Sequence, residues 1–169
     1  MKQISIVFPN QLFRNSPLLN LKSEILIIED SLFFGNDKYI KQKVHQNKFI
    51  FHRASINSYK IYLEGLGFKV IYGKNEKSFA TQDYFYKYSL QDYKSINIIN
   101  PHDYLIMRRI KKFTAENRIL LNVINSPMFI TSDELKDNFK FSTKKPLMRR
   151  FYENQRRNKK ILINADQSP

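Results

Sequence analysis

The 169-residue chain contains no cysteine and no tryptophan. Without cysteine it cannot form a disulfide, a thiolate zinc site or an iron–sulfur cluster of its own. The chain also has no apolar run near the roughly 18 residues that a membrane span needs. Met1-Lys2 leads directly into the apolar run Ile4 to Phe8, so we expect no secretory signal either. These absences predict a cytoplasmic protein with no membrane partner.

Glycine is scarce, with four residues in the chain, and none of them directly follows the first apolar run. A dinucleotide-binding G-x-G-x-x-G motif or a phosphate-binding loop therefore cannot form there. There is no G-x-S-x-G nucleophile motif, and His45, His52 and His102 lack the spacing of a metal-binding pair on one helix. We predict no catalytic residue and no metal site, although a metal site assembled from distant residues stays open. An independent α/β hydrolase or nucleotide-binding domain is therefore the weakest hypothesis.

Positive charge is abundant, with 29 Lys and Arg residues against 15 Asp and Glu residues and a net charge of +14. This balance favours an anionic partner, most simply nucleic acid. Because lysine is frequent throughout the chain, the position of the charge is more informative than its total. One cluster spans Arg108 to Lys112, and a second, in residues 140–160, has nine basic residues and one acid, Glu153. The nucleic-acid-binding candidates in the second cluster are Lys144, Lys145, Arg149, Arg150, Arg156 and Arg157. The alternative for such a charge run is a solvated surface.

Five short apolar runs rich in β-branched residues predict the strands of a parallel sheet. They are Ile4 to Phe8, Ile25 to Glu29, Lys69 to Tyr72, Ile96 to Ile99 and Leu120 to Ile124. Helical patterns separate most of them, at Phe49 to Leu66, Thr81 to Tyr93 and Leu105 to Asn117. This alternation predicts an α/β fold: a Rossmann-like, doubly wound sheet of five buried parallel strands in the order 3-2-1-4-5.

The pattern changes after Pro127, from alternating strands and helices to helix and loop. Ser132 to Leu135 has the composition of a helix start, and Pro146 opens a second helix. The residues that share an apolar face of this second helix, opposite the arginines, are Leu147, Met148, Phe151 and Tyr152. We predict an α/β domain over residues 1–127 and a basic helical extension over residues 128–169. The apolar face suggests a neighbouring domain.

Polar side chains follow the predicted strands at their carboxyl ends. In doubly wound sheets, ligands bind beside these ends, at the switch point where the strand order reverses. Turn formation explains asparagine and proline at such positions, but it explains Gln11 and Glu29 less well. The candidates for a binding site at this edge are Asn10, Gln11, Glu29, Asp30, Pro101 and Asp103.

The connection from Asp30 to Asn47 is longer than the usual βα loop of roughly two to six residues. We expect its Phe33 and Phe34 to cover a planar ligand; the alternative is that they only plug the end of the sheet. The helix that follows has Lys48 and His52 in its first turns, and its free backbone N–H groups favour a polar group nearby. The alternative for His52 is a core histidine satisfied by the backbone.

Several of these segments, in this order, resemble one known family. They are Pro9-Asn10-Gln11-Leu12-Phe13, Leu26-Ile27-Ile28-Glu29-Asp30, Lys48 with His52-Arg53-Ala54-Ser55, Asn100-Pro101-x-Asp103 and Phe151-Tyr152-x-x-Gln155-Arg156-Arg157. The most specific piece is His52 to Ser55, followed by Tyr59 and Leu63. Over nearly its whole length the chain resembles the N-terminal part of the deoxyribodipyrimidine photolyase-related proteins, the bacterial cryptochromes and (6-4) photolyases with an iron–sulfur cluster.

The resemblance implies that the chain is the antenna half of a larger flavoprotein for light-dependent DNA repair or blue-light sensing. In that family the α/β domain binds a ribityllumazine-type antenna chromophore, which passes excitation energy to FAD in a helical C-terminal domain. The residues that the resemblance places in or near the antenna pocket are Asn10, Gln11, Glu29, Asp30, Phe33, Phe34, Lys48, His52, Pro101 and Asp103.

The resemblance also implies which functions this segment lacks. FAD and the 4Fe–4S cluster are expected only in a C-terminal region beyond Pro169, because this chain has no cysteine and no tryptophan to reduce a flavin. We expect that C-terminal domain and DNA as partners of the full-length protein, and no DNA repair by this segment alone. The alternative is a basic α/β module that binds nucleic acid through residues 140–160 without any chromophore.

Overall fold

The computed structural model describes residues 2–75, 79–131 and 147–164 of the chain. The chain divides into two compact units, Met1–Ser126 and Pro127–Pro169. The predicted helix start at Ser132 to Leu135, the helix-opening Pro146, and the candidates Lys144 and Lys145 lie outside the described residues.

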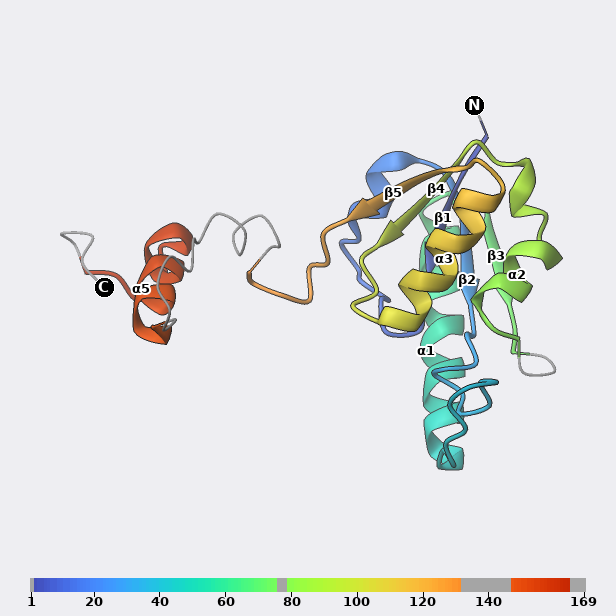
Figure 1. The fold of residues 1–169 in the computed structure, drawn as a ribbon, viewed down its shortest axis with the longest axis horizontal. Coiled ribbons are helices and arrows are strands. Elements are labelled where there is room, and N and C mark those ends of the chain that lie inside the picture. Colours follow the sequence, from blue (N-terminus) through green and yellow to red (C-terminus); the bar gives the residue numbers. More distant parts are fainter. Residues whose placement is uncertain (1, 76–78, 132–146, 165–169) are drawn as a thin grey trace. The chain divides into compact units, whose positions relative to one another are not determined.

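Five parallel strands form the sheet of the first unit, and the predicted α/β fold is confirmed (Figure 1). The strands are β1 (Gln3–Val7), β2 (Glu24–Ile28), β3 (Val70–Gly73), β4 (Ser95–Ile99) and β5 (Leu120–Ile124), in the order β3-β2-β1-β4-β5. In register, Ile6 of β1 lies beside Leu26 of β2 and Ile98 of β4. The order reverses between β1 and β4, which sets the switch point beside the ends of these two strands.

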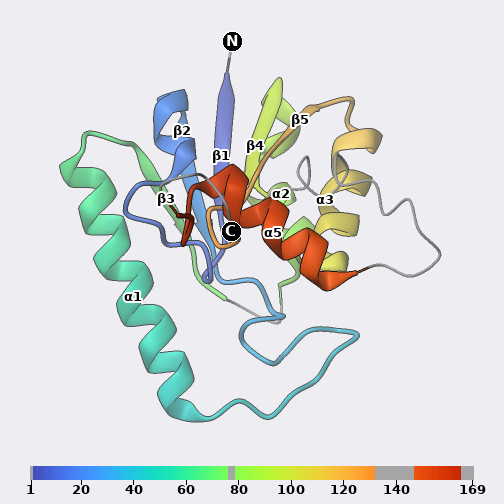
Figure 2. The same cartoon turned by 90° about the vertical axis from the view of Figure 1, so that its left-hand side faces the viewer.

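Helices cover both faces of the sheet, as Figure 2 shows. The helix α1 (Gln46–Gly65) lies on one face and buries Ile56, Tyr59 and Leu63 against it. The helices α2 (Thr81–Lys87) and α3 (Tyr104–Glu116) cover the other face. Each apolar side chain buried in this way contributes about 1.5–3 kcal/mol to folding. The sheet therefore holds α1 on one face and α2 with α3 on the other.

The first turns of α1 extend past the ends of the strands (Figure 1). The helix begins three residues before the predicted Phe49, because the His45 side chain caps it by accepting a hydrogen bond from the Asn47 N–H at 3.2 Å. The helix ends at Gly65, one residue before the predicted Leu66, which is exposed. The first fully buried residue of α1 is Ile56, so the early turns of the helix lie outside the core.

The predicted single helix over Thr81 to Tyr93 is wrong, since two short elements occupy this range. The helix α2 ends at Lys87, and a 3-10 turn, η2 (Leu90–Asp92), follows. Ser89 between them has φ of +51°, a left-handed conformation that interrupts helical hydrogen bonding. A second 3-10 turn, η1 (Pro17–Leu21), follows β1 and is capped by Ser16.

The prediction that all five strands are buried is also wrong at β5. This edge strand pairs with β4 alone, and its Leu120 and Val123 are 63% and 45% exposed. An apolar run identifies a strand but not how many of its faces a neighbour covers.

The second unit contains α5 (Met148–Lys159), in which no residue is buried. On its predicted apolar face Phe151 is half-buried, whereas Leu147, Met148 and Tyr152 are exposed. Among the described residues of both units, no helix combines the length and the apolar character needed to cross a membrane.

Candidate functional site

Gln11 fills the switch point between β1 and β4. Its side chain is buried, and its Nε2 donates hydrogen bonds to the Ile99 and Asn100 carbonyls at 3.2 and 3.1 Å. Pro101, which follows Asn100, is also buried. Gln11 therefore joins the end of β1 to the end of β4, and the open hollows lie on either side of it rather than at the switch point itself. The Gln11 Oε1 is buried without a hydrogen-bond partner among the described residues.

The first hollow, which we call the α1 groove, lies between the segment after β1 and one side of α1, and its volume is about 600 Å³. It is lined by Pro9, Asn10, Leu12, Phe13, Arg14, Phe51, Ser55, Ser58, Tyr59 and Tyr62. The α1 residues among them recur three or four positions apart, which places them on one side of the helix. Four aromatic rings therefore form the walls, and an amide, two hydroxyls and a guanidinium add polar groups.

Two tyrosines of α1 hold the opposite wall of the α1 groove in place. The Tyr59 hydroxyl donates to the Phe13 carbonyl at 2.9 Å, and the Tyr62 hydroxyl donates to the Arg14 carbonyl at 3.0 Å. Their rings stack with centroids 6.0 Å apart at 29°. Burial raises the pKa of Tyr59 to about 12, so this hydroxyl remains a donor at neutral pH. The groove is thus formed by the protein alone, before any ligand binds.

Glu29 lies at the end of β2 and is fully buried, and its carboxylate is bound by other side chains and backbone groups of the protein. Arg53 of α1 donates to both carboxylate oxygens at 3.3 and 3.4 Å, the Asn75 N–H donates at 2.8 Å, and the Tyr72 hydroxyl donates as well. Burial, together with the hydrogen bond to Glu29, raises the pKa of Tyr72. The structure therefore places Glu29 as a brace between β2, β3 and α1, with Arg53 half-exposed above it.

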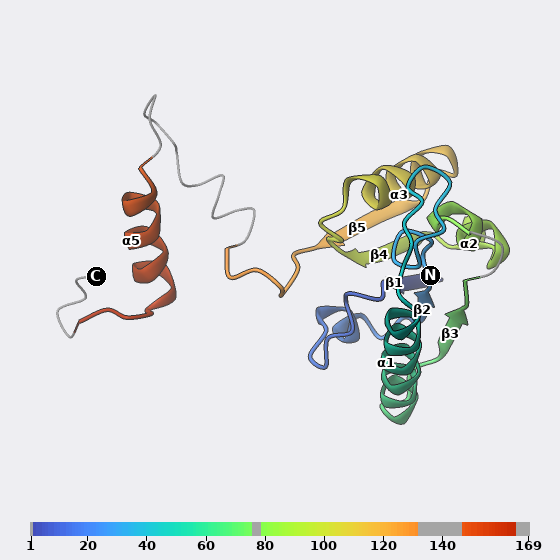
Figure 3. The ribbon, with the colours of Figure 1, turned by 90° about the horizontal axis from the view of Figure 1, so that it is seen from below.

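Asp30 belongs to a second buried cluster, which anchors the connection between β2 and α1 to α3. Arg109 of α3 contacts Asp37 at 2.8 and 3.0 Å and approaches Asp30 to 3.9 Å. Thr81 donates a hydrogen bond to Asp30, and Ser31 donates one to Asp37 at 2.7 Å. Figure 3 shows this connection passing from the α3 side of the unit to the start of α1.

The two carboxyls of this cluster are shifted in opposite directions. Burial raises the pKa of Asp30. Burial also acts to raise the pKa of Asp37, but hydrogen bonds from Arg109 and Ser31 outweigh it and lower that pKa to about 2. Asp37 is therefore the permanent counter-ion of Arg109, and the cluster holds the connection at neutral pH.

Phenylalanines surround the ring of His52. Phe33 meets it edge-on at 6.5 Å, and the Phe34 and Phe51 rings lie 5.8 and 6.0 Å away. Burial, with the nearby charge of Lys48, lowers the pKa of His52, so the ring is neutral at pH 7. Its Nε2 is buried and has no hydrogen-bond partner in the described part of the chain. Lys48 itself is exposed on the first turn of α1.

Asp103 lies on the other side of Gln11, where its carboxylate caps α3 by accepting from the Ile106 N–H at 2.9 Å. It borders a second hollow of about 420 Å³ beside α3. The sequence candidates are thus divided. Asn10 lines the α1 groove, Asp103 lines the second hollow, and Glu29 and Asp30 are engaged inside the protein.

The basic candidates of α5 lie in the second unit. Arg149 pairs with Glu153 at 2.8 Å, and the hydrogen bond from Arg149 lowers the pKa of that carboxyl. Arg150 and Arg157 are exposed, and Arg156 is half-buried beside the Tyr152 ring. This helix therefore presents positive charge along much of its surface.

Several site residues were missed in the sequence. Phe51, Ser58 and Tyr62 were not among the candidates, although with Ser55 they recur at helical spacing, which is the signal for a second side of α1. Arg109 gave no signal, because it lies within a run of basic residues that is otherwise solvated. In the described ranges, no group of three His, Cys, Asp or Glu residues is arranged to bind a metal.

The sheet order defines a Rossmann-like α/β domain without a phosphate loop after β1, and a groove lies beside the carboxyl edge of its sheet. A family model described as "Deoxyribodipyrimidine photo-lyase-related protein" matches residues 5–169. The chain therefore belongs to the deoxyribodipyrimidine photolyase-related protein family. It is also 35% identical over 141 residues to Uncharacterized protein R852 of Acanthamoeba polyphaga mimivirus, a match that covers 79% of this chain and 68% of that protein.

Proposed function

We propose that this chain is an antenna-type domain that binds a ribityllumazine-type chromophore in the α1 groove. The observation that carries the proposal is the groove itself, in which Phe13, Phe51, Tyr59 and Tyr62 surround about 600 Å³ beside the carboxyl edge of the sheet. That volume lies within the range of roughly 300–1,000 Å³ that small-molecule sites occupy. Membership of the photolyase-related family supports this ligand class.

The chemistry of the groove suits both parts of such a chromophore. A flat heteroaromatic ring gains most from aromatic walls, here the Phe51 ring and the Tyr59–Tyr62 pair. A ribityl chain carries several hydroxyls, which the Asn10 amide and the hydroxyls of Ser55 and Ser58 can bind. The bound chromophore would supply light absorption, and these residues would orient it and exclude water.

Six other candidates support the walls of the proposed site. Gln11 fixes the segment after β1, and Glu29 fixes α1 through Arg53. Phe33, Phe34 and His52 pack where the connection from β2 meets α1, and Asp30 anchors that connection. We assign direct ligand contact to Asn10 and a positioning role to these six residues.

Titration with 6,7-dimethyl-8-ribityllumazine tests the proposal, with the fluorescence anisotropy of the ligand as the readout. We expect saturable binding, and we expect Phe51→Ala to weaken it about tenfold by removing one stacking face. Ile61→Ala is the matched control, because Ile61 is an exposed apolar residue of the same helix outside the groove. The proposal fails if anisotropy stays flat at high protein concentration, or if both variants behave alike.

We propose further that the photochemistry of the whole protein needs FAD held by an additional domain. The cysteine-free chain cannot ligate an iron–sulfur cluster, and it contains no tryptophan to pass an electron to a flavin. Catalysis of repair is therefore assigned to that domain, with DNA as the partner of the complete protein.

A second candidate function is nucleic-acid binding through α5, which the exposed Arg150 and Arg157 favour. Phosphate contacts would make the affinity fall steeply with salt. Binding of labelled duplex DNA at several salt concentrations tests this candidate with Arg150→Gln/Arg157→Gln. An unchanged salt dependence in this variant would remove α5 from the interface.

A further inference from the structure

Two neighbouring hollows flank Arg108 on the exposed side of α3. One, of about 420 Å³, is lined by Asn100, His102, Asp103, Tyr104, Met107, Arg108 and Lys111. The other, of about 400 Å³, is lined by Tyr39, Gln82, Leu105, Arg108, Arg109 and Lys112. Because Arg108 belongs to both, the two hollows are adjacent, and each combines a tyrosine with a lysine. We call this region the α3 surface.

The tyrosines of the α3 surface present open aromatic faces. Tyr104 is 76% exposed and Tyr39 is 73% exposed. The Arg109 guanidinium lies 5.9 Å from the centre of the Tyr39 ring and the Lys38 ammonium 5.8 Å from it. Since Arg109 is itself fixed by Asp37, the Tyr39 ring is supported from the protein side. A planar group from a ligand can stack on each tyrosine.

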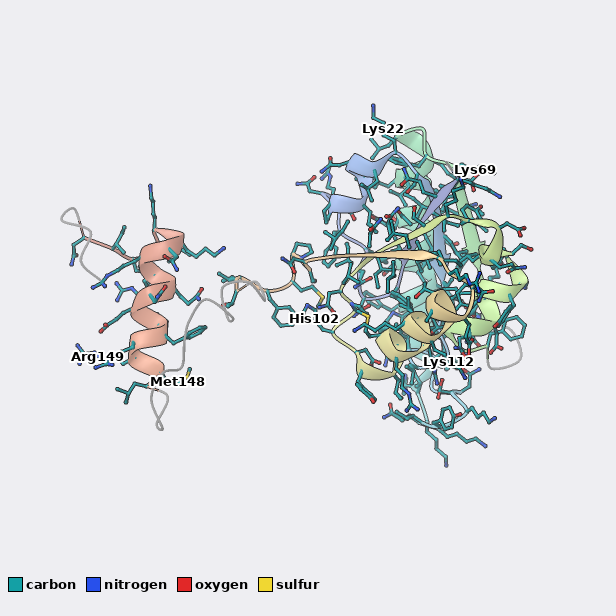
Figure 4. All side chains as sticks on the ribbon, turned by 45° about the horizontal axis from the view of Figure 1, so that its top comes forward. Lys22, Lys69, His102, Lys112, Met148 and Arg149 are labelled. Atoms are coloured by element: carbon teal, nitrogen blue, oxygen red, sulfur yellow. The ribbon has the colours of Figure 1, made fainter. Side chains whose placement is uncertain are left out.

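Two cations of the α3 surface, Arg108 and Lys111, have no acid partner among the described residues, and both are exposed. The nearby Asp103 caps the helix. Two other cations of this surface have acid partners: Arg109 is paired with Asp37 at 2.8 Å, and Lys112 lies 3.8 Å from Glu116. At the amino-terminal edge of the sheet, by contrast, Lys69 is paired with Glu24. Figure 4 shows Lys112 on α3 and Lys22 with Lys69 at the opposite end of the unit.

We propose that the α3 surface binds single-stranded nucleic acid, with two consecutive bases stacked on Tyr104 and Tyr39 and the linking phosphate at Arg108. Single strands expose the planar faces that such stacking needs, whereas duplex bases are stacked on one another. Lys111 and Lys112 stand one turn further along α3 and would contact the flanking phosphates. The surface lies on the face of the sheet opposite α1, so the proposal does not depend on the chromophore.

Fluorescence anisotropy of a labelled twelve-nucleotide oligo(dT) with the full chain tests the proposal. We expect Tyr39→Ala/Tyr104→Ala to weaken binding by about tenfold or more, and Tyr39→Phe/Tyr104→Phe to retain it, because phenylalanine keeps the stacking face. Arg108→Gln/Lys111→Gln should lower the slope of log affinity against log salt by about 0.7 for each phosphate that the variant no longer neutralises. Lys69→Gln/Lys94→Gln is the matched control, with the same reduction of charge at the other edge of the sheet, and should change the affinity less.

Photo-crosslinking with 4-thiothymidine in the same oligonucleotide, read by mass spectrometry, locates the binding surface independently. Crosslinks on peptides that contain Tyr39 or Tyr104 support the proposal. Crosslinks confined to residues 147–160 overturn it, as does equal affinity of the tyrosine-to-alanine variant and the wild type. A thymidine mononucleotide that competes as strongly, per molecule, as the oligonucleotide also overturns it, because a strand should engage both hollows at once.

Discussion

The buried Asp37–Arg109 pair ties the long connection between β2 and α1 to α3, and Asp37→Asn removes the negative charge of that pair. The Asp37 side chain is fully buried, and that of Arg109 is 10% exposed. Removing one partner of a buried ion pair costs roughly 3–5 kcal/mol, because the other charge stays buried without compensation. Asp30, at 3.9 Å, remains as a partial counter-ion. We therefore expect a loss of stability near the lower limit, about 3 kcal/mol.

Urea unfolding followed by far-UV circular dichroism measures this loss. With a slope of about 2 kcal/mol per molar urea, the midpoint should fall by about 1.5 M. Asp92→Asn, on the exposed turn η2, is the control and should change the free energy of unfolding by less than about 0.5 kcal/mol. If Asp37→Asn unfolds at the same urea concentration as this control, the buried pair does not anchor the connection and the argument is refuted.

Other perturbations test the neighbouring parts of the site. Tyr59→Phe leaves the Phe13 carbonyl without its donor and should cost about 1 kcal/mol in urea unfolding, while weakening lumazine binding. Gly35→Ala should lower the free energy of unfolding by about 2 kcal/mol, because Gly35 has φ of +71° and an added Cβ would collide with the Gln42 carbonyl and Val44. Wild-type stability in this variant would contradict the described turn. The pKa of Asp37 is about 2 in the folded protein and 3.8 when the carboxyl is unpaired. The contribution of Asp37 to stability is therefore complete above pH 3.8 and is lost as the pH falls towards 2. Over that pH interval, the difference in the free energy of unfolding between the wild type and Asp37→Asn should shrink. Burial lowers the pKa of His52 below 6.5, so protonation of the ring opposes folding. An NMR titration should therefore give a His52 midpoint below 6.5. A midpoint above that value would place the ring in a solvated or acid-paired environment.

The sheet was predictable from the sequence because its strands are short apolar runs separated by helical patterns. The strand order followed from the rules for crossover connections, and the polar positions at the strand ends followed from parallel topology. The break at Ser89 was not predictable in the same way, since serine adopts a left-handed conformation only where its surroundings require it. The exposure of β5 depends on which elements pack against this edge strand, and the residues of β5 do not encode that.

The site was predictable in position but not in its contacts. Glu29 and Asp30 end β2 at the expected edge, yet whether a carboxylate meets a ligand or an internal arginine depends on residues far along the chain, here Arg53 and Arg109. Gln11 likewise meets carbonyls almost 90 positions away. In the sequence, Phe51 is one of several apolar residues of the predicted helix. The structure shows that it shares a groove with the segment after β1, which the sequence does not reveal.

Chemical-shift mapping tests the central claim most directly, because it locates the chromophore as well as detecting it. In ¹H–¹⁵N spectra of the isotopically labelled chain, addition of 6,7-dimethyl-8-ribityllumazine should shift the amides of residues 10–14 and 51–62, which border the α1 groove, and leave those of β5 unchanged. Shifts centred on another part of the chain, or none at saturating ligand, would contradict the assignment of the α1 groove as an antenna site.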